Sequence, residues 1–142
     1  MGRACVHRER CSFEGQAAME LEHCVESCET SMYEPDEEIG DWRPALFGVR
    51  ADMASGVPPS TIAAKIHNSL ADVIVAAAAQ AAQERVVLSG GCFQNRVLTE
   101  RVIKRLRESG FEPCWHQRVP PNDGGLAVGQ AAIAALHRSD VG

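Results

Sequence analysis

The chain has 142 residues, of which 45% are hydrophobic, and a formal net charge of −5. This length fits one domain with a core of its own, and the acidic balance argues against nucleic acid as a partner. The N-terminus lacks the apolar stretch of a signal peptide, and no apolar run approaches the ~20 residues that cross a bilayer, so we expect no membrane association. The six cysteines follow no regular spacing, which favours a reduced cytoplasmic protein over a disulfide framework.

The first residues are predicted to form an irregular leader. Residues 1–11 show no hydrophobic periodicity. Cys5, His7 and Cys11 are the residue types that bind zinc, but a tetrahedral site needs a fourth ligand and usually closer cysteine pairs. We therefore expect a loose leader over residues 1–11, followed by one domain over residues 12–142.

The N-terminal part of that domain is predicted to hold one helix, a loop and a short strand. Apolar residues recur at helical spacing over residues 15–28, and Ser12 is a candidate for starting this helix. Residues 29–41 are acidic and contain proline and glycine, as a loop does. We expect a short strand over residues 42–49, limited by its proline, and a helical turn over residues 50–55.

The C-terminal part alternates helices and short strands. Helical periodicity predicts helices over residues 58–81, 94–109 and 126–137, while short β-rich runs predict strands over residues 85–89 and 111–116. This order predicts an α/β fold in which the two strands are adjacent and parallel, with helices on both faces of the sheet.

A glycine pair follows the first of these strands, in the sequence SGGCFQN. Gly90 and Gly91 have no Cβ, so a ligand can approach the backbone, and the following helix N-terminus adds partial positive charge. Asn95 offers both a donor and an acceptor. The alternative is a tight turn in which Asn95 only starts the next helix, and the residues alone leave both readings open.

A second glycine pair follows the second strand, in the sequence VPPNDGG. Asp123 is the best candidate for a metal ligand, because hard and borderline cations favour carboxylate oxygen. The alternative is that Asp123 caps the closing helix, a role that Asn122 fills less well. Because both glycine pairs follow strands, we expect them at the same edge of the sheet, as half of a nucleotide and metal site.

Three more residues invite a functional interpretation beside a structural one. Gly15 marks either a close backbone approach or the turn into the first helix. His67 lies beside the apolar stripe of the longest helix, where a packed histidine is more frequent than a ligand. His116 precedes the VPPNDGG turn without an evident partner.

Four segments together resemble one protein family. The segments FEGQAAMELE, IAAKIHNSLADVI, VVLSGGCFQNRVLTERVIKRL and VPPNDGGLAVGQAAIA resemble the C-terminal end of the hydrogenase maturation carbamoyltransferases of the HypF type. The resemblance covers about residues 12–137. It implies the second lobe of an actin-like ATPase fold, with a mixed sheet and flanking helices.

The resemblance also implies a chemistry and a set of site residues. HypF-type enzymes use carbamoyl phosphate and ATP to form carbamoyl-adenylate, and pass the carbamoyl group to the C-terminal cysteine of HypE for cyanide ligand synthesis. By motif, Asp123 matches the metal ligand, with zinc, iron and magnesium left open. Asn95 matches the residue that contacts the nucleoside, and Gly15, Gly90 and Gly91 match glycines of the nucleotide pocket.

The family's paired histidine metal ligands and first actin-like lobe have no match in this sequence. We therefore expect a carbamoyltransferase lobe that is inactive alone and pairs with HypE and a complementary N-terminal lobe, with a homodimer over the unpaired face as a further option. One alternative is a non-catalytic remnant that serves as an interaction module. Another is a lobe of the related enzyme that forms threonylcarbamoyladenosine in tRNA, which predicts a more basic surface.

Overall fold

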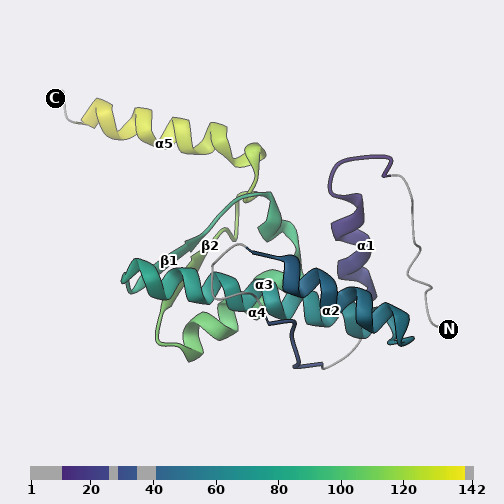
Figure 1. Ribbon diagram of the computed structural model, residues 1–142. Coiled ribbons are helices and arrows are strands. Elements are labelled where there is room, and N and C mark those ends of the chain that lie inside the picture. Colours follow the sequence, from purple (N-terminus) through teal and green to yellow (C-terminus); the bar gives the residue numbers. More distant parts are fainter. Residues whose placement is uncertain (1–10, 26–28, 35–40, 140–142) are drawn as a thin grey trace.

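The computed structural model describes residues 11–25, 29–34 and 41–139. The expected leader, with Cys5 and His7 of the zinc hypothesis, therefore lies almost wholly outside the described residues. The elements are α1 (Gln16–Cys24), α2 (Arg43–Ala54), α3 (Pro59–Ala81), β1 (Arg85–Leu88), the 3₁₀ turn η1 (Gly91–Gln94), α4 (Arg96–Glu108), β2 (Glu112–Trp115), the 3₁₀ turn η2 (Asp123–Gly125) and α5 (Leu126–Ser139), as drawn in Figure 1.

The two strands form a parallel pair, as the sequence predicts. In the register of the sheet, Val86 lies opposite Pro113 and Leu88 lies opposite Trp115. Because side chains alternate along a strand, these four residues share one face of the sheet. The α/β fold and the parallel pairing are therefore confirmed.

The hydrophobic core lies between that face and two helices. Leu88, Val102 and Leu106 are at most 2% exposed, and Ala71 of α3 joins them in one buried cluster. Helix α3 contributes a stripe of small and branched residues, and α4 contributes a leucine or valine at each turn, which is the pattern of helices that pack on one side. Both helices thus cover the same face of the sheet.

The expectation of helices on both faces is wrong for the described residues. Val87 points to the opposite face and is 69% exposed. Val87 and Cys114 line a shallow depression of about 170 Å³, to whose wall Trp115 and His116 at the end of the strand also contribute. The side chains of a buried strand would be covered on both faces, so this sheet has an open apolar face.

The predicted strand over residues 42–49 is also wrong, because residues 43–49 belong to α2 and Trp42 is the N-cap of this helix. Pro44 lies in the first turn of this helix, where its missing N–H costs no hydrogen bond. Ala45 is the buried residue of α2, whereas Leu46 and Phe47 are 65% and 67% exposed. The proline that limits a strand is therefore the residue that starts this helix.

Helix α1 begins after Gly15 rather than through a side-chain cap. Gly15 has φ +78° and no side-chain capping bond. Ser12 acts through its backbone, whose N–H donates to Oε1 of Gln16 at 2.7 Å. The helix ends at Cys24, and residues 26–28 of the predicted helix lie outside the described part of the chain.

Helix α3 is long and apolar enough, by length and composition, to cross a membrane, so the expectation that no such segment exists was wrong. Its packing is that of a core helix. Asn68 and Ser69, both at most 4% exposed, hydrogen-bond to residues outside α3, and buried polar groups need such partners.

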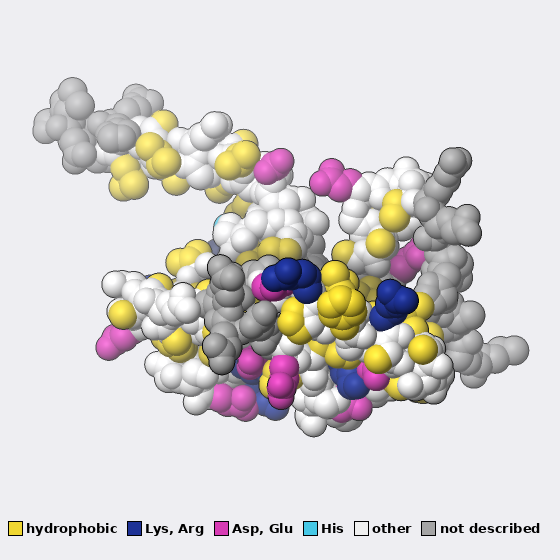
Figure 2. Space-filling view, in the orientation of Figure 1, with side chains coloured by type: hydrophobic (Ala, Val, Ile, Leu, Met, Phe, Trp, Pro, Cys, Tyr) yellow, Lys and Arg dark blue, Asp and Glu magenta, His cyan; other side chains and the backbone are white. Residues whose placement is uncertain are grey.

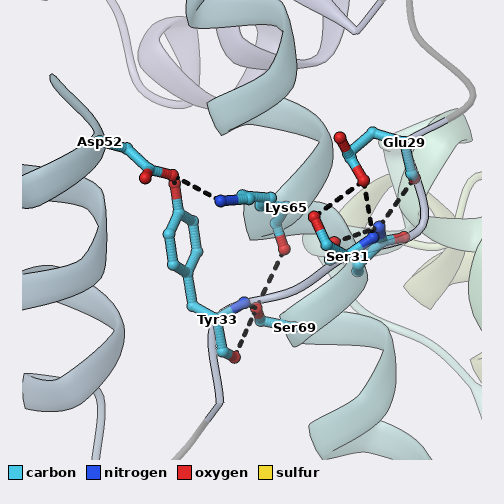
Figure 3. Close-up of polar contacts among 7 residues, drawn as sticks. Glu29, Ser31, Tyr33, Asp52, Lys65 and Ser69 are labelled. Atoms are coloured by element: carbon cyan, nitrogen blue, oxygen red, sulfur yellow. Dashed lines mark hydrogen bonds and ion pairs between the residues drawn. The ribbon is translucent and has the colours of Figure 1, made fainter. Parts of the chain in front are cut away.

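A polar cluster ties the segment of residues 29–34 to α2 and α3 (Figure 3). The N–H of Tyr33 donates to Oγ of Ser69 at 2.9 Å, and that hydroxyl donates back to the Tyr33 carbonyl at 2.9 Å. The Tyr33 hydroxyl donates to Asp52 at 2.7 Å, and Lys65 donates to the same carboxylate oxygen at 2.7 Å. Lys65 and Tyr33 hold the pKa of Asp52 below its usual range, whereas burial, with Asp52, raises the pKa of Tyr33.

Helix α5 projects away from the rest of the molecule (Figure 1). Apolar side chains line it in the space-filling view (Figure 2). Four large ones are more than half exposed: Leu126, Val128, Ile133 and Leu136. An apolar helix without packing partners among the described residues is an exposed patch of the kind that marks interaction surfaces.

Candidate nucleotide site at the carboxyl edge of the sheet

The loops that follow β1 and β2 meet at the carboxyl edge of the sheet. The N–H of Gly90 donates to the carbonyl of Pro121 at 2.8 Å. Oγ of Ser89 lies 3.2 Å from Nε2 of His116, so His116 has a partner that the sequence did not reveal. The two glycine-containing loops are therefore joined, as expected from the topology.

The glycine pair after β1 leaves the backbone open. Gly90 has φ +102°, a conformation that side chains with a Cβ rarely adopt. A Cβ built on Gly90 or Gly91 meets no atom within 4 Å. The space beside both α-carbons is therefore open, which leaves room for a ligand to approach.

Asn95 is the N-cap of α4, which confirms the structural reading of this residue. Its Oδ1 accepts from the N–H of Leu98 at 2.8 Å. Its Nδ2 lies 2.9 Å from Nε2 of His67, a residue that is 1% exposed. His67 is therefore packed in the core, as the sequence favoured, and each of the two carboxamide heavy atoms of Asn95 already makes one bond.

A carboxylate from α1 occupies the N-terminus of α4. Oε1 of Glu22 accepts from the N–H of Arg96 at 2.7 Å and from that of Val97 at 3.4 Å. Glu22 and Asn95 therefore satisfy the first amides of α4, so these amides are already paired within the chain. Among the described residues, the amides of Gly91 and Cys92 are the ones at this turn that have no hydrogen-bond acceptor.

Glu22 is the residue that sequence reasoning missed. It lies 74 residues before Arg96, so no local pattern connects them. The only sequence feature that could have indicated this role is an acidic residue on the last turn of an amphipathic helix. Acidic residues are common on the solvated faces of such helices, so this feature is not specific.

Asp123 is exposed and opens the short turn η2. Asn122 performs the capping, because its Oδ1 accepts from the N–H of Gly124 at 3.1 Å. The expectation that Asp123 would be the better cap is therefore wrong. A Cβ on Gly125 would lie 2.5 Å from the carbonyl oxygen of Pro120, so the second glycine is required by close packing of the loop.

The described residues do not by themselves make a metal site. No group of three or more His, Cys, Asp or Glu side chains gathers within residues 11–25, 29–34 and 41–139. Asp123 offers one carboxylate, which leaves most positions of a cation's coordination shell to other ligands.

The cysteines differ in their redox state. Cys24 is disulfide-bonded, contrary to the expectation of reduced cysteines, whereas Cys11, Cys92 and Cys114 have free thiols.

Gly15 stands at the opposite end of α1 from Glu22. The residue of α1 that reaches α4 is Glu22, in the last turn, and Gly15 precedes the first turn. At ~1.5 Å of rise per residue, the two ends are separated by about 10 Å along the helix axis. A Cβ on Gly15 meets no atom within 4 Å, so its positive φ, and not close packing, accounts for the glycine here.

The fold and the joined loops define an α/β lobe of the kind found in Kae1-like carbamoyltransferase domains. Residues 2–130 match the family described as "Carbamoyltransferase, Kae1-like Domain, second subdomain". The chain belongs to this family of HypF carbamoyltransferases.

Individual relatives agree with this assignment. The chain is 39% identical to carbamoyltransferase HypF of Synechocystis over 126 residues, which are 84% of this chain and 16% of that protein. It is 37% identical to carbamoyltransferase HypF of Rhizobium leguminosarum over 129 residues, which are 86% of this chain and 17% of that protein. The chain thus spans about a sixth of the length of these relatives.

Solved structures show the same fold. A crystal structure of full-length HypF in a phosphate- and nucleotide-bound form matches with a TM-score of 0.76 and 42% identity, over 89% of this chain and 18% of that one. The crystal structure of HypF of T. kodakarensis matches with a TM-score of 0.72 and 24% identity, over 92% of this chain and 18% of that one. The second likeness supports the fold alone.

Proposed function

We propose that this chain forms one wall of the nucleotide site of a HypF-type carbamoyltransferase that acts in [NiFe] hydrogenase maturation. In this role the site binds ATP and the carbamoyl-adenylate made from it, and the carbamoyl group passes to the C-terminal cysteine of a HypE-type partner. The observation that carries the proposal is the bond between Gly90 and Pro121, which joins the two loops that bear the candidate residues at one edge of the sheet.

The wall contributes binding groups. The space beside the α-carbons of Gly90 and Gly91 is open, and the amides of Gly91 and Cys92 are suited to an anionic group. Asn95 retains one Nδ2 hydrogen and one Oδ1 lone pair for a nucleoside, since each atom makes one bond within the chain. Gly15 is included because it matches by motif a glycine of the family's nucleotide pocket, and a Cβ built there meets no atom within 4 Å.

Asp123 is proposed to supply one carboxylate to a divalent metal ion. The described residues hold no complete ligand set, so the remaining ligands have to come from another polypeptide or lobe.

A complementary N-terminal lobe is the partner that this arrangement needs. Carbamoyl transfer depends on groups held on both sides of the reacting centre. The open sheet face at Val87 and the uncovered α5 are apolar surfaces that such a lobe would cover. A HypE-type acceptor would then meet the assembled site.

A second function is favoured by the same exposed surfaces. A non-catalytic interaction module would use α5 and the open sheet face without binding nucleotide. ATP titration of the chain, alone and with the complementary part of a HypF, separates the two. We expect ATP binding that strengthens with the complementary part and weakens in Asn95→Ala. Association without any ATP binding would identify the interaction module instead.

A further inference from the structure

We propose that His67 is a positioning residue that orients the carboxamide of Asn95 for the nucleotide. This inference rests on the proposed function, because it assumes that Asn95 contacts the ligand. His67 belongs to α3 and Asn95 to the loop after β1, 28 residues later. The pair therefore connects the core helix to the candidate site.

The hydrogen bonds of His67 define the state of its ring. Nδ1 lies 2.7 Å from the carbonyl oxygen of Ala63, one turn earlier on α3. A carbonyl oxygen only accepts, so Nδ1 carries the hydrogen. In the neutral ring Nε2 is then an acceptor, and it receives the N–H of Asn95 Nδ2 at 2.9 Å.

Two independent partners give the same orientation of Asn95. His67 requires the amino group on its side, and the N–H of Leu98 requires the oxygen on the other side, at 2.8 Å. A flipped carboxamide would lose both bonds, because the oxygen would face a lone pair and the amino group would face a donor. The free hydrogen and lone pair of Asn95 are consequently presented in one fixed arrangement.

His67 acts through Asn95 and does not touch the ligand. His67 is 1% exposed, and its two ring nitrogens face the Ala63 carbonyl and the carboxamide of Asn95 at the start of α4. A ligand that meets a carboxamide already held in place loses less freedom on binding. Loss of His67 should therefore weaken nucleotide binding even where the fold is kept.

The test is a double-mutant cycle on ATP affinity, measured with the full chain together with the complementary part of a HypF. The variants are His67→Phe, His67→Gln, Asn95→Ala and the two combinations with Asn95→Ala. The control is His23→Gln, because His23 makes the same bond to the carbonyl one turn earlier, at 2.6 Å to Met19, but is exposed. Urea unfolding of each variant reports whether the fold is kept.

We expect His67→Phe and Asn95→Ala each to weaken ATP binding by about tenfold, the effect of one oriented hydrogen bond. The combined variant should lose no more than Asn95→Ala alone, because His67 acts only through Asn95. His67→Gln, whose amide oxygen can accept from Asn95, should stay within about threefold of the wild type. His23→Gln should bind as the wild type does.

Additive losses in the combined variant, or unchanged binding in His67→Phe, would overturn the role of His67 while leaving the nucleotide site in place. If His67→Phe does not fold, the cycle with His67→Gln decides in its place. ATP binding that is weaker in the combination of His67→Gln with Asn95→Ala than in Asn95→Ala alone would contradict the inference. Failure of the wild type to bind ATP would overturn the proposed function, and the positioning role with it.

Discussion

The α3–α4–sheet core and the C-terminal helix α5 use similar apolar residues in opposite ways. In the core, Val102 and Leu106 of α4 are fully buried against α3 and β1. On α5, Ile133 and Leu136 are 58% and 69% exposed, and the helix projects from the body (Figure 1). The composition of a helix thus predicts that it has an apolar face, but not what covers that face.

The candidate site lies between these two regions. The loop after β1 is anchored in the core through His67 and Asn95, whereas the loop that holds Asp123 leads directly into α5. One side of the site is therefore rigidly supported within the chain, and the other depends on a helix that lacks packing partners among the described residues.

The largest effect is expected in the core. Leu106→Ala should lower the free energy of unfolding by about 2–5 kcal/mol, because it leaves a cavity in a fully buried cluster. The matched change Leu136→Ala on α5 should alter it by less than about 0.5 kcal/mol. Urea unfolding of both variants measures the difference. Equal losses would mean that α5 is packed in solution.

A smaller loss is expected where α1 meets α4. Glu22→Ala should cost about 1 kcal/mol, because it removes the acceptor of two amides at a helix N-terminus. The control Glu14→Ala removes the same charge from an exposed position before α1 and should have little effect. Thermal unfolding of the two variants is the measurement, and an equal effect would contradict the capping role of Glu22.

Stability should fall in acid through Asp52. Its pKa is lowered in the folded chain by Lys65 and Tyr33, so its contribution is fully present above the unfolded pKa of about 3.9. This contribution is lost as the pH falls through the lower folded pKa. Urea unfolding between pH 5 and pH 2.5 should show a steeper decline for the wild type than for Asp52→Asn. Parallel declines would indicate that other carboxylates account for the acid sensitivity.

The α5 surface should affect association and not folding. Ile133→Ser combined with Leu136→Ser should weaken binding to the complementary part of a HypF, or self-association, while the unfolding midpoint stays unchanged. Both side chains are exposed, and apolar patches of this kind stabilise interfaces. Sedimentation with and without the complementary part measures the change. Unaltered association would exclude this helix from the interface.

The sequence predicted the elements that have strong local patterns. The alternation around β1 and β2 and the stripe of α3 gave the correct types and the parallel pairing. The region around Pro44 was assigned to a strand because proline limits strands, although proline also starts helices. The local sequence does not show which of these two roles Pro44 has. The structure shows it, because Ala45 is buried as a residue of α2.

The candidate site was predictable in part for the same reason. The meeting of the two loops followed from the topology of parallel strands. The role of Glu22 at α4 and the bond between His67 and Asn95 are contacts between distant segments, and no spacing rule indicates them. The open sheet face was missed because the alternation of elements suggests helices on both sides.

Reconstitution of activity decides whether this chain is one lobe of a two-part carbamoyltransferase. The measurement is carbamoyl-phosphate-dependent turnover of ATP with a HypE-type acceptor, using this chain alone and this chain with Synechocystis HypF from which the matching segment is deleted. Our expectation is that the chain alone shows no turnover, that the chain with the complementary part turns over ATP, and that Asp123→Ala abolishes this turnover. Robust turnover by the chain alone, or none in the reconstituted pair while ATP and the complementary part are bound, would contradict it.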